Sequence, residues 1–227
     1  GATGDSIRTI VMRDLDFGDR VTVLSKNTAL PTPVGAAAVD FRAAARLGIN
    51  GVVQITPAAG GVTITLHDVA AKQVLQRAVV MLPGTPNTAA WRLAVHAASD
   101  QCEEWISGTR GIAATRLAYV GDGRIWLVDS DGANARAITQ AGRALSPAFR
   151  PDGQAVAYAT LEAGGSAIRV ADLRGASRQV LEPRGLNISP TFTPDGASIA
   201  YAHGEDFGTD LYMVPASGGT PRRISIG

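Results

Sequence analysis

The residues best suited to chemistry in this 227-residue chain are a short acidic run, one cysteine and three histidines. Asp129, Asp131 and Gly132 resemble the start of a calcium-binding loop, which places carboxylates at alternate positions. A twelve-residue loop of that kind ends on a glutamate, but Gln140 stands there. A β-turn between two strands explains the same residues, and we favour this turn while the sequence leaves calcium binding open.

The remaining candidates do not indicate catalysis. Cys102 lies in a predicted helix, where a small buried residue is the ordinary interpretation of a single cysteine. His67, His96 and His203 fall in three different predicted elements, without the spacing or the cysteine company of a zinc site. The sequence also has no Walker phosphate loop and no Gly-x-Ser-x-Gly elbow. We therefore expect no enzyme, no catalytic residue, no metal and no cofactor.

Composition limits the kinds of partner. Lys and Arg total 21 against 20 Asp and Glu, so a formal charge of +1 gives no general attraction to nucleic acid. Hydrophobic residues make up 45% of the chain, enough for a substantial core, yet no stretch reaches the ~20 apolar residues that cross a bilayer. We expect neither nucleic-acid binding nor direct membrane insertion.

A repeat of 43 residues organises the C-terminal half and would position these side chains. Residues 146–153 and 189–196 share the pattern Ser-Pro-x-Phe-x-Pro-Asp-Gly, and a strand-like run follows each. Apolar runs at 125–129, 168–172 and 211–215 keep the same spacing. A repeat of about 40–45 residues with four short strands is typical of a β-propeller blade. Residues 113–227 are therefore predicted to form an all-β partial β-propeller of about three four-stranded blades, with an ordinary β-sandwich as the weaker alternative.

The N-terminal half has a different pattern. It predicts a small α/β domain over residues 1–112, in which Gly48 and Gly108 end helices in the left-handed conformation. The predicted helices cover residues 5–15, 40–48 and 87–107, and the predicted strands cover residues 21–24, 51–56, 61–69 and 72–80.

Several stretches resemble the TolB family, the periplasmic component of the Tol/Pal envelope system. They are residues 47–53, residues 91–100 continuing into 115–120, and the repeated Ser-Pro-x-Phe-x-Pro-Asp-Gly segments. The family joins a small α/β domain to a six-bladed propeller. The resemblance implies a non-catalytic periplasmic scaffold for protein–protein interaction, with envelope proteins as its partners.

The resemblance also implies where partners bind. In the family, an N-terminal segment engages an inner-membrane partner, and loops around one mouth of the propeller engage a peptidoglycan-associated lipoprotein. Carried over by position, those loops fall at residues 140–144 and 184–187. The implied contact residues are Arg143, Arg184, Leu186 and Asn187.

The chain also departs from the family pattern. It starts within what resembles the family's first helix, and it holds about half of the propeller. Because unpaired strand edges invite pairing, we expect a partner to cover the open edges of these blades. This leads to an alternative function, a structural accessory subunit docked on the periplasmic face of a larger membrane-protein complex.

Overall fold

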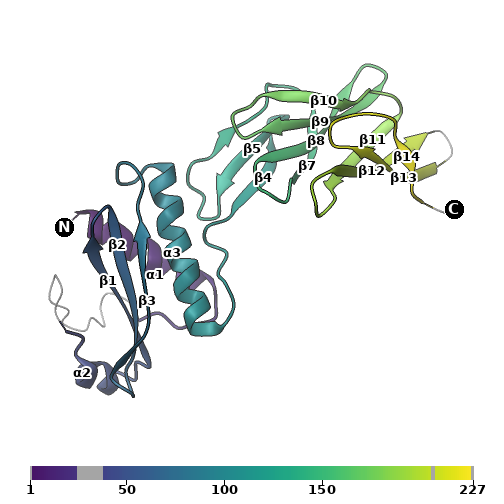
Figure 1. The fold of residues 1–227 in the computed structure, drawn as a ribbon. Coiled ribbons are helices and arrows are strands. Elements are labelled where there is room, and N and C mark those ends of the chain that lie inside the picture. Colours follow the sequence, from purple (N-terminus) through teal and green to yellow (C-terminus); the bar gives the residue numbers. More distant parts are fainter. Residues whose placement is uncertain (1, 25–37, 206–207, 226–227) are drawn as a thin grey trace. The chain divides into compact units, whose positions relative to one another are not determined.

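The computed structural model describes residues 2–24, 38–205 and 208–225, and the chain divides into two compact units, Gly1–Thr115 and Arg116–Gly227. Each unit has its own secondary structure (Figure 1). Each also has its own hydrophobic core. Of the described helices, none is long and apolar enough to cross a membrane. The elements of the first unit are α1 (Ala2–Phe17), α2 (Phe41–Arg46), β1 (Gly51–Ala58), β2 (Gly61–Asp68), β3 (Gln73–Met81) and α3 (Ala89–Ser107).

The first unit is a two-layer α/β structure. Its antiparallel sheet has the order β1-β2-β3, and α1 and α3 pack against each other and against one face of the sheet (Figure 1). Helix α1 presents Ile7, Ile10 and Val11 at helical spacing to Ile64 of the central strand and to Trp91 of α3. This shared core explains why the two helices lie on the same side of the sheet.

The ends of the helices follow the sequence prediction, whereas one predicted strand is wrong. Gly48, the second residue after α2, and Gly108, directly after α3, have φ values of +71° and +76°, in the left-handed conformation that ends a helix. Residues 21–24 form no strand. Val21 and Val23 instead pack against the core of the unit, so these apolar side chains are partly buried without a ladder of backbone hydrogen bonds.

Helix α3 carries buried polar side chains that bind other parts of the first unit. The carboxylate of Asp100 accepts hydrogen bonds from the backbone N–H groups of Ala113 (2.6 Å) and Ala114 (3.0 Å). Glu103 pairs with Arg20 at 2.9 Å. Asp100 therefore holds the segment that follows α3, whereas Glu103 holds Arg20, which follows α1.

The same helix also holds a buried histidine–carboxylate pair. His96 is fully buried, and its Nδ1 lies 2.8 Å from Oδ2 of Asp14 on α1. This contact joins the two helices through polar groups within an otherwise apolar layer.

The second unit contains three antiparallel sheets, as the partial-propeller prediction required. The first sheet has three strands, rather than the predicted four, and the other two have four (Figure 1). The strands are β4 (Arg116–Gly121), β5 (Arg124–Asp129), β6 (Arg136–Ala137), β7 (Ala144–Phe149), β8 (Ala155–Glu162), β9 (Gly165–Asp172), β10 (Ser177–Leu181), β11 (Leu186–Phe192), β12 (Ser198–Glu205), β13 (Gly208–Pro215) and β14 (Arg222–Arg223).

The hydrophobic core of the second unit lies between successive sheets. One cluster joins Ile125 and Leu127 of the first sheet to Val156 of the second. Another joins Ile168 of the second sheet to Ile199 of the third. Each sheet thus buries its apolar residues against the next sheet, which is the packing expected of propeller blades.

The repeated Pro-Asp-Gly triplets form tight turns. The N–H of Gly153 donates to the carbonyl of Arg150 (2.8 Å), and the N–H of Gly196 donates to that of Thr193 (2.7 Å). Both glycines have positive φ, +68° and +70°. The turn therefore uses the conformational freedom of glycine at the same place in both repeats.

The Ser-Pro part of the same motif lies within a strand, not within the turn. Ser146 and Ser189 have positive φ values of +49° and +52°, and the pairing register of β7 and β11 shifts at these positions. Each Ser-Pro pair is therefore a β-bulge, where proline removes no ladder hydrogen bond.

Candidate protein-binding surface

The residues predicted to contact a partner lie just before, or at the start of, the first strands of two blades. Arg143 precedes β7, Arg184 precedes β11, and Leu186 and Asn187 begin β11. Arg143, Arg184 and Leu186 are exposed, with 46% of Leu186 accessible, whereas Asn187 is 1% accessible. The contribution of the three exposed residues to a contact stays a prediction, and Asn187 is buried beside Arg184 and Leu186.

Asn187 joins two blades through hydrogen bonds. Its backbone N–H donates to Oγ of Ser166 (2.6 Å), and its side-chain Nδ2 donates to the carbonyls of Ser166 (2.6 Å) and Arg184 (3.0 Å). The hydroxyl of Ser166 in turn donates to the Asn187 carbonyl at 2.7 Å. Since a buried amide must have partners, this network fixes the backbone on which Arg184 and Leu186 stand.

The Asn187 amide also sets the tautomer of His203. Both donors of the amide are used by carbonyls, so Oδ1 is the acceptor and Nδ1 of His203, 2.7 Å away, carries the proton. The other ring nitrogen lies 3.3 Å from Oε1 of Glu205, whose side chain is 68% exposed. The ring packs edge-on against Tyr212, with centroids 5.2 Å apart. A chain of polar contacts therefore runs from the blade interior to the surface.

Glycines allow the backbones of the two blades to meet at this place. Gly165 has φ +145°, and a Cβ atom there would lie 2.2 Å from the carbonyl oxygen of Gly185. Gly185 has φ +63°, and its own Cβ would lie 2.9 Å from the carbonyl oxygen of Gly204. A parallel bridge joins Gly165 to Gly185, so the approach is a backbone contact that no side chain can enter.

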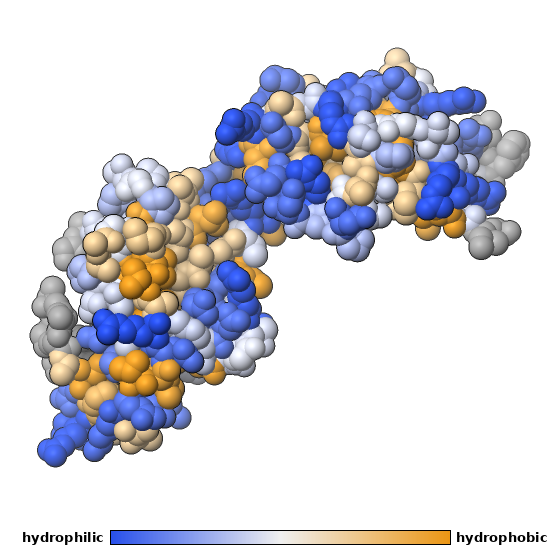
Figure 2. Space-filling model, in the orientation of Figure 1, coloured by the Kyte–Doolittle hydropathy of each residue, from blue (hydrophilic) through white to orange (hydrophobic). Residues whose placement is uncertain are grey.

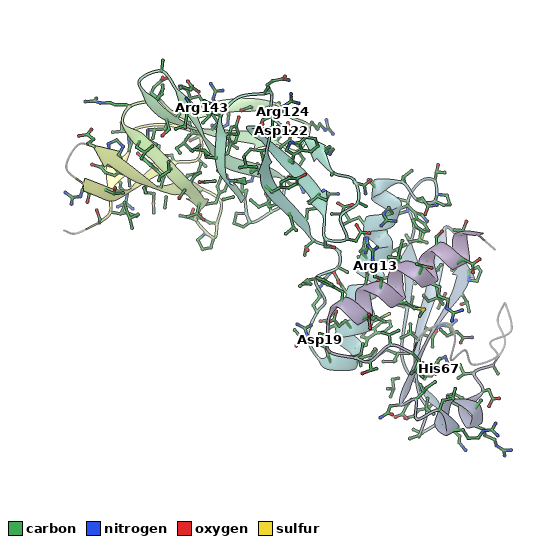
Figure 3. The ribbon with its side chains drawn as sticks, turned by 180° about the vertical axis from the view of Figure 1, so that it is seen from behind. Arg13, Asp19, His67, Asp122, Arg124 and Arg143 are labelled. Carbon is green, nitrogen blue, oxygen red and sulfur yellow. The ribbon has the colours of Figure 1, made fainter. Side chains whose placement is uncertain are left out.

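The preceding pair of sheets repeats this close approach. Gly123, in the hairpin between β4 and β5, would place a Cβ 2.0 Å from the carbonyl oxygen of Gly142. The N–H of Ala144 donates to the Gly123 carbonyl at 3.1 Å. Arg143 lies between these contacts, and Figure 3 shows it on the same side of the unit as Arg124. The surface around Arg143 and the surface around Leu186 are therefore equivalent positions in successive blades.

The surface itself is shallow. An open depression is lined by Gly185, Leu186, Gly204, Glu205 and Thr209. It combines one exposed apolar side chain with a carboxylate and a hydroxyl. This mixture of an apolar centre and polar surroundings is typical of protein–protein contacts.

The acidic side chains that resemble a calcium-binding loop form hydrogen bonds within the fold. The carboxylate of Asp129 binds Nε of Arg116 (3.2 Å) and Nδ2 of Asn134 (2.6 Å), and Oδ1 of Asp131 accepts the N–H of Ala133 (2.9 Å). These contacts make the acidic run a hydrogen-bonded turn. Among the described residues, no group of three or more His, Cys, Asp or Glu side chains could hold a metal ion.

Cys102 is buried in the core of the first unit, with 1% of its surface accessible. Burial raises the pKa of its thiol to about 12. Since the thiolate is the reactive form, Cys102 is a packing residue at neutral pH.

Sequence reasoning missed the interior of this surface. The sequence pattern does not indicate Ser166 and His203 as partners of Asn187, nor the close approach at the junction glycines. The one available signal was a glycine shortly before the first strand in both repeats, Gly142 and Gly185, 43 residues apart.

A family model described as the TolB beta propeller domain matches residues 103–227. The chain belongs to the TolB family. It is 32% identical over 182 residues to the Tol-Pal system protein TolB of Methylococcus capsulatus, a match that covers 75% of this chain and 42% of the relative. The Sodalis glossinidius protein of the same name is 32% identical over 179 residues, covering 74% of this chain and 42% of the relative.

A solved TolB structure agrees with the fold. The crystal structure of TolB from Acinetobacter baumannii superposes with a TM-score of 0.81 at 27% identity, covering 97% of this chain and 57% of that one. The predicted α/β domain followed by a partial propeller is confirmed by this TolB likeness. The chain spans less than half the length of the two curated relatives above.

Proposed function

We propose that this chain is a non-catalytic periplasmic scaffold that binds envelope proteins through the surface around Arg184 and Leu186. The observation that carries the proposal is the contrast in burial along one short segment. Arg184 and Leu186 are exposed, whereas Asn187 is buried and hydrogen-bonded to two neighbouring strands. Relatives named as Tol-Pal system proteins give the cellular setting of the proposal.

A fixed backbone favours binding at this place. The junction glycines and the Asn187 network hold the segment before a partner arrives, so binding orders little additional chain. Leu186 offers an apolar anchor, and Arg184 is of the residue type most often found at energetically important positions of interfaces. Arg143 extends the surface onto the preceding blade, where its carbonyl accepts the N–H of Leu161 at 3.1 Å and its side chain is exposed.

The partner we propose for this surface is the peptidoglycan-associated lipoprotein of the same envelope system. Isothermal titration with the soluble domain of that lipoprotein tests the assignment. Leu186→Asp and Arg184→Glu should each weaken binding by about tenfold or more, because each replaces an anchor at the centre of the contact.

A matched control separates this effect from a general loss of exposed leucine. Leu117 is 57% exposed on β4 and lies outside the proposed surface. Leu117→Asp should leave the affinity unchanged. Equal affinities for all three variants would contradict the proposed surface.

Affinity purification of the native protein from cells, followed by mass spectrometry, tests the cellular assignment separately. Recovery together with Tol-Pal components supports the scaffold. Recovery with an unrelated membrane complex would instead support the accessory-subunit alternative.

A further inference from the structure

Strand β3 forms one edge of the sheet in the first unit, and no other described strand pairs with its outer side. The N–H of Leu82, just after β3, donates to the carbonyl of Gly60 at 3.0 Å. Because peptide groups alternate in direction along an antiparallel strand, those of Arg77, Val79 and Met81 point away from β2. The edge therefore presents a row of backbone donors and acceptors to solvent.

The side chains along this edge are unusually apolar for an exposed strand. Val79 and Met81 are each 61% accessible, Val74 is 52% accessible and Leu75 is 48% accessible. Figure 2 shows apolar side chains along the region where Figure 1 draws β3, with hydrophilic side chains between them. An apolar strip of this kind signals an interaction surface.

Within the part of the chain that the structure describes, residues 77–81 lack the features that usually prevent edge-to-edge pairing. Such features include proline, several charges, a bulge or a covering element. The opposite edge strand, β1, contains Pro57, whereas β3 contains no proline. The register irregularity of β3 falls at Leu75, before this segment, and Arg77 is the single charged residue of the strand.

We propose that residues 77–81 of β3 bind an extended segment of another polypeptide, which adds to the sheet as an antiparallel strand. The partner segment supplies backbone groups for Arg77, Val79 and Met81, and apolar side chains that cover Val79 and Met81. It also supplies a carboxylate for Arg77, which has no ion-pair partner within the described ranges. This surface belongs to the first unit and does not depend on the proposed contact around Leu186.

The width of the strip identifies an extended peptide as the occupant. Apolar exposure is concentrated on one strand, and Gln73, Gln76 and Arg77 of the same strand are exposed polar residues. A helix or a membrane surface would need a broader apolar area and would leave the outward peptide groups unpaired. An extended peptide can cover the apolar side chains and also form hydrogen bonds with the outward peptide groups.

The test uses the complete chain and an acetylated peptide of alternating valine and threonine that carries one glutamate. Amide exchange by NMR should show that the N–H groups of Arg77, Val79 and Met81 become at least about tenfold slower to exchange when the peptide is bound. A second peptide, N-methylated at alternate amides, keeps every side chain but cannot form the ladder, and should bind at least about tenfold more weakly.

Two variants on the same strand complete the test. Val79→Lys should weaken peptide binding by about tenfold, whereas Val74→Lys, on the far side of the irregularity, should leave it unchanged. Thermal unfolding of both variants establishes that the first unit stays folded. Binding that tolerates N-methylation, equal loss in both variants, or no peptide binding would overturn the proposal. A self-associated chain that Val79→Lys makes monomeric would also overturn it, because the occupant would then be a second copy.

Discussion

The two units satisfy their buried polar groups in different ways. In the first unit, single acidic side chains on α3 bind particular partners, as Asp100 does with the N–H groups that follow the helix. In the second unit, backbones meet at glycines, and one amide, Asn187, spans two blades. The close backbone contact at glycine occurs at two successive junctions between blades. The carboxylate contacts of α3 are not part of a repeated pattern. The contact that recurs between blades depends on backbone conformation, whereas the contacts of Asp100 and Asn187 depend on the identity of the side chain.

The largest expected effect tests the glycine contact between blades. Gly165→Ala should lower the free energy of unfolding of the second unit by about 4 kcal/mol, the sum of backbone strain and overpacking against the Gly185 carbonyl. Urea unfolding measures this loss. Gly153→Ala is the control, because Gly153 also has positive φ but has open space around its Cβ position. It should cost about 1 kcal/mol, and equal losses would show that space at the junction is not limiting.

Asn187→Ala should cost about 3 kcal/mol, since it leaves carbonyls of Ser166 and Arg184 and the Nδ1 proton of His203 without their partner. A double-mutant cycle with Ser166→Ala measures whether the network acts as one unit. We expect a coupling energy of about 1 kcal/mol or more. Strictly additive losses would mean that the hydrogen bonds contribute independently.

Asp100→Asn tests the side-chain contacts of the first unit. The amide can accept one of the two backbone hydrogen bonds but presents a donor to the other, so the first unit should lose about 2 kcal/mol. Hydrogen exchange of the amides of Ala113 and Ala114 should become faster. Asp16→Asn, on the exposed surface of α1, is the control and should change neither quantity. Unchanged exchange at both amides would show that Asp100 does not hold this segment.

The smallest expected effect is a pH dependence of stability that arises from one aspartate in each repeated turn. A hydrogen bond from Thr193 lowers the pKa of Asp195, and a hydrogen bond from Arg150 lowers that of Asp152. Each carboxylate therefore contributes stability above the ordinary pKa of 3.8, and this contribution is lost as the pH falls below that value.

Chemical unfolding at about pH 5 and about pH 2.5 should show a smaller loss of stability in Asp195→Asn and in Asp152→Asn than in the unchanged chain. Added salt should reduce the effect at Asp152, whose partner is charged, more than at Asp195, whose partner is a hydroxyl. Equal salt dependence would contradict this assignment of causes.

Much of the fold could be predicted because local sequence patterns determine it. The 43-residue repeat predicted the sheets of the second unit, and Gly48 and Gly108 predicted two helix ends. Residues 21–24 were predicted wrongly. A short apolar run has the same sequence pattern whether it forms a strand or packs against the core without pairing. The bulges at Ser146 and Ser189 could not be predicted, since spacing alone does not give backbone conformation.

The interior of the candidate surface could not be predicted for a different reason. Asn187 depends on Ser166, 21 residues away, and on His203, 16 residues away, on other strands. Such partners become neighbours only after the blades have packed. One sequence gives no measure of that proximity, so the prediction placed Asn187 with its exposed neighbours.

Along residues 184–187, positions that the fold constrains alternate with positions that are free to vary. Gly185 and Asn187 are constrained by the scaffold, whereas Arg184 and Leu186 project from it without supporting it. If the proposed surface binds a partner, we expect substitutions at the two exposed positions to change partner preference while the blades keep their geometry. A combinatorial library restricted to positions 143, 184 and 186 would therefore test whether the proposed surface sets specificity on an intact framework.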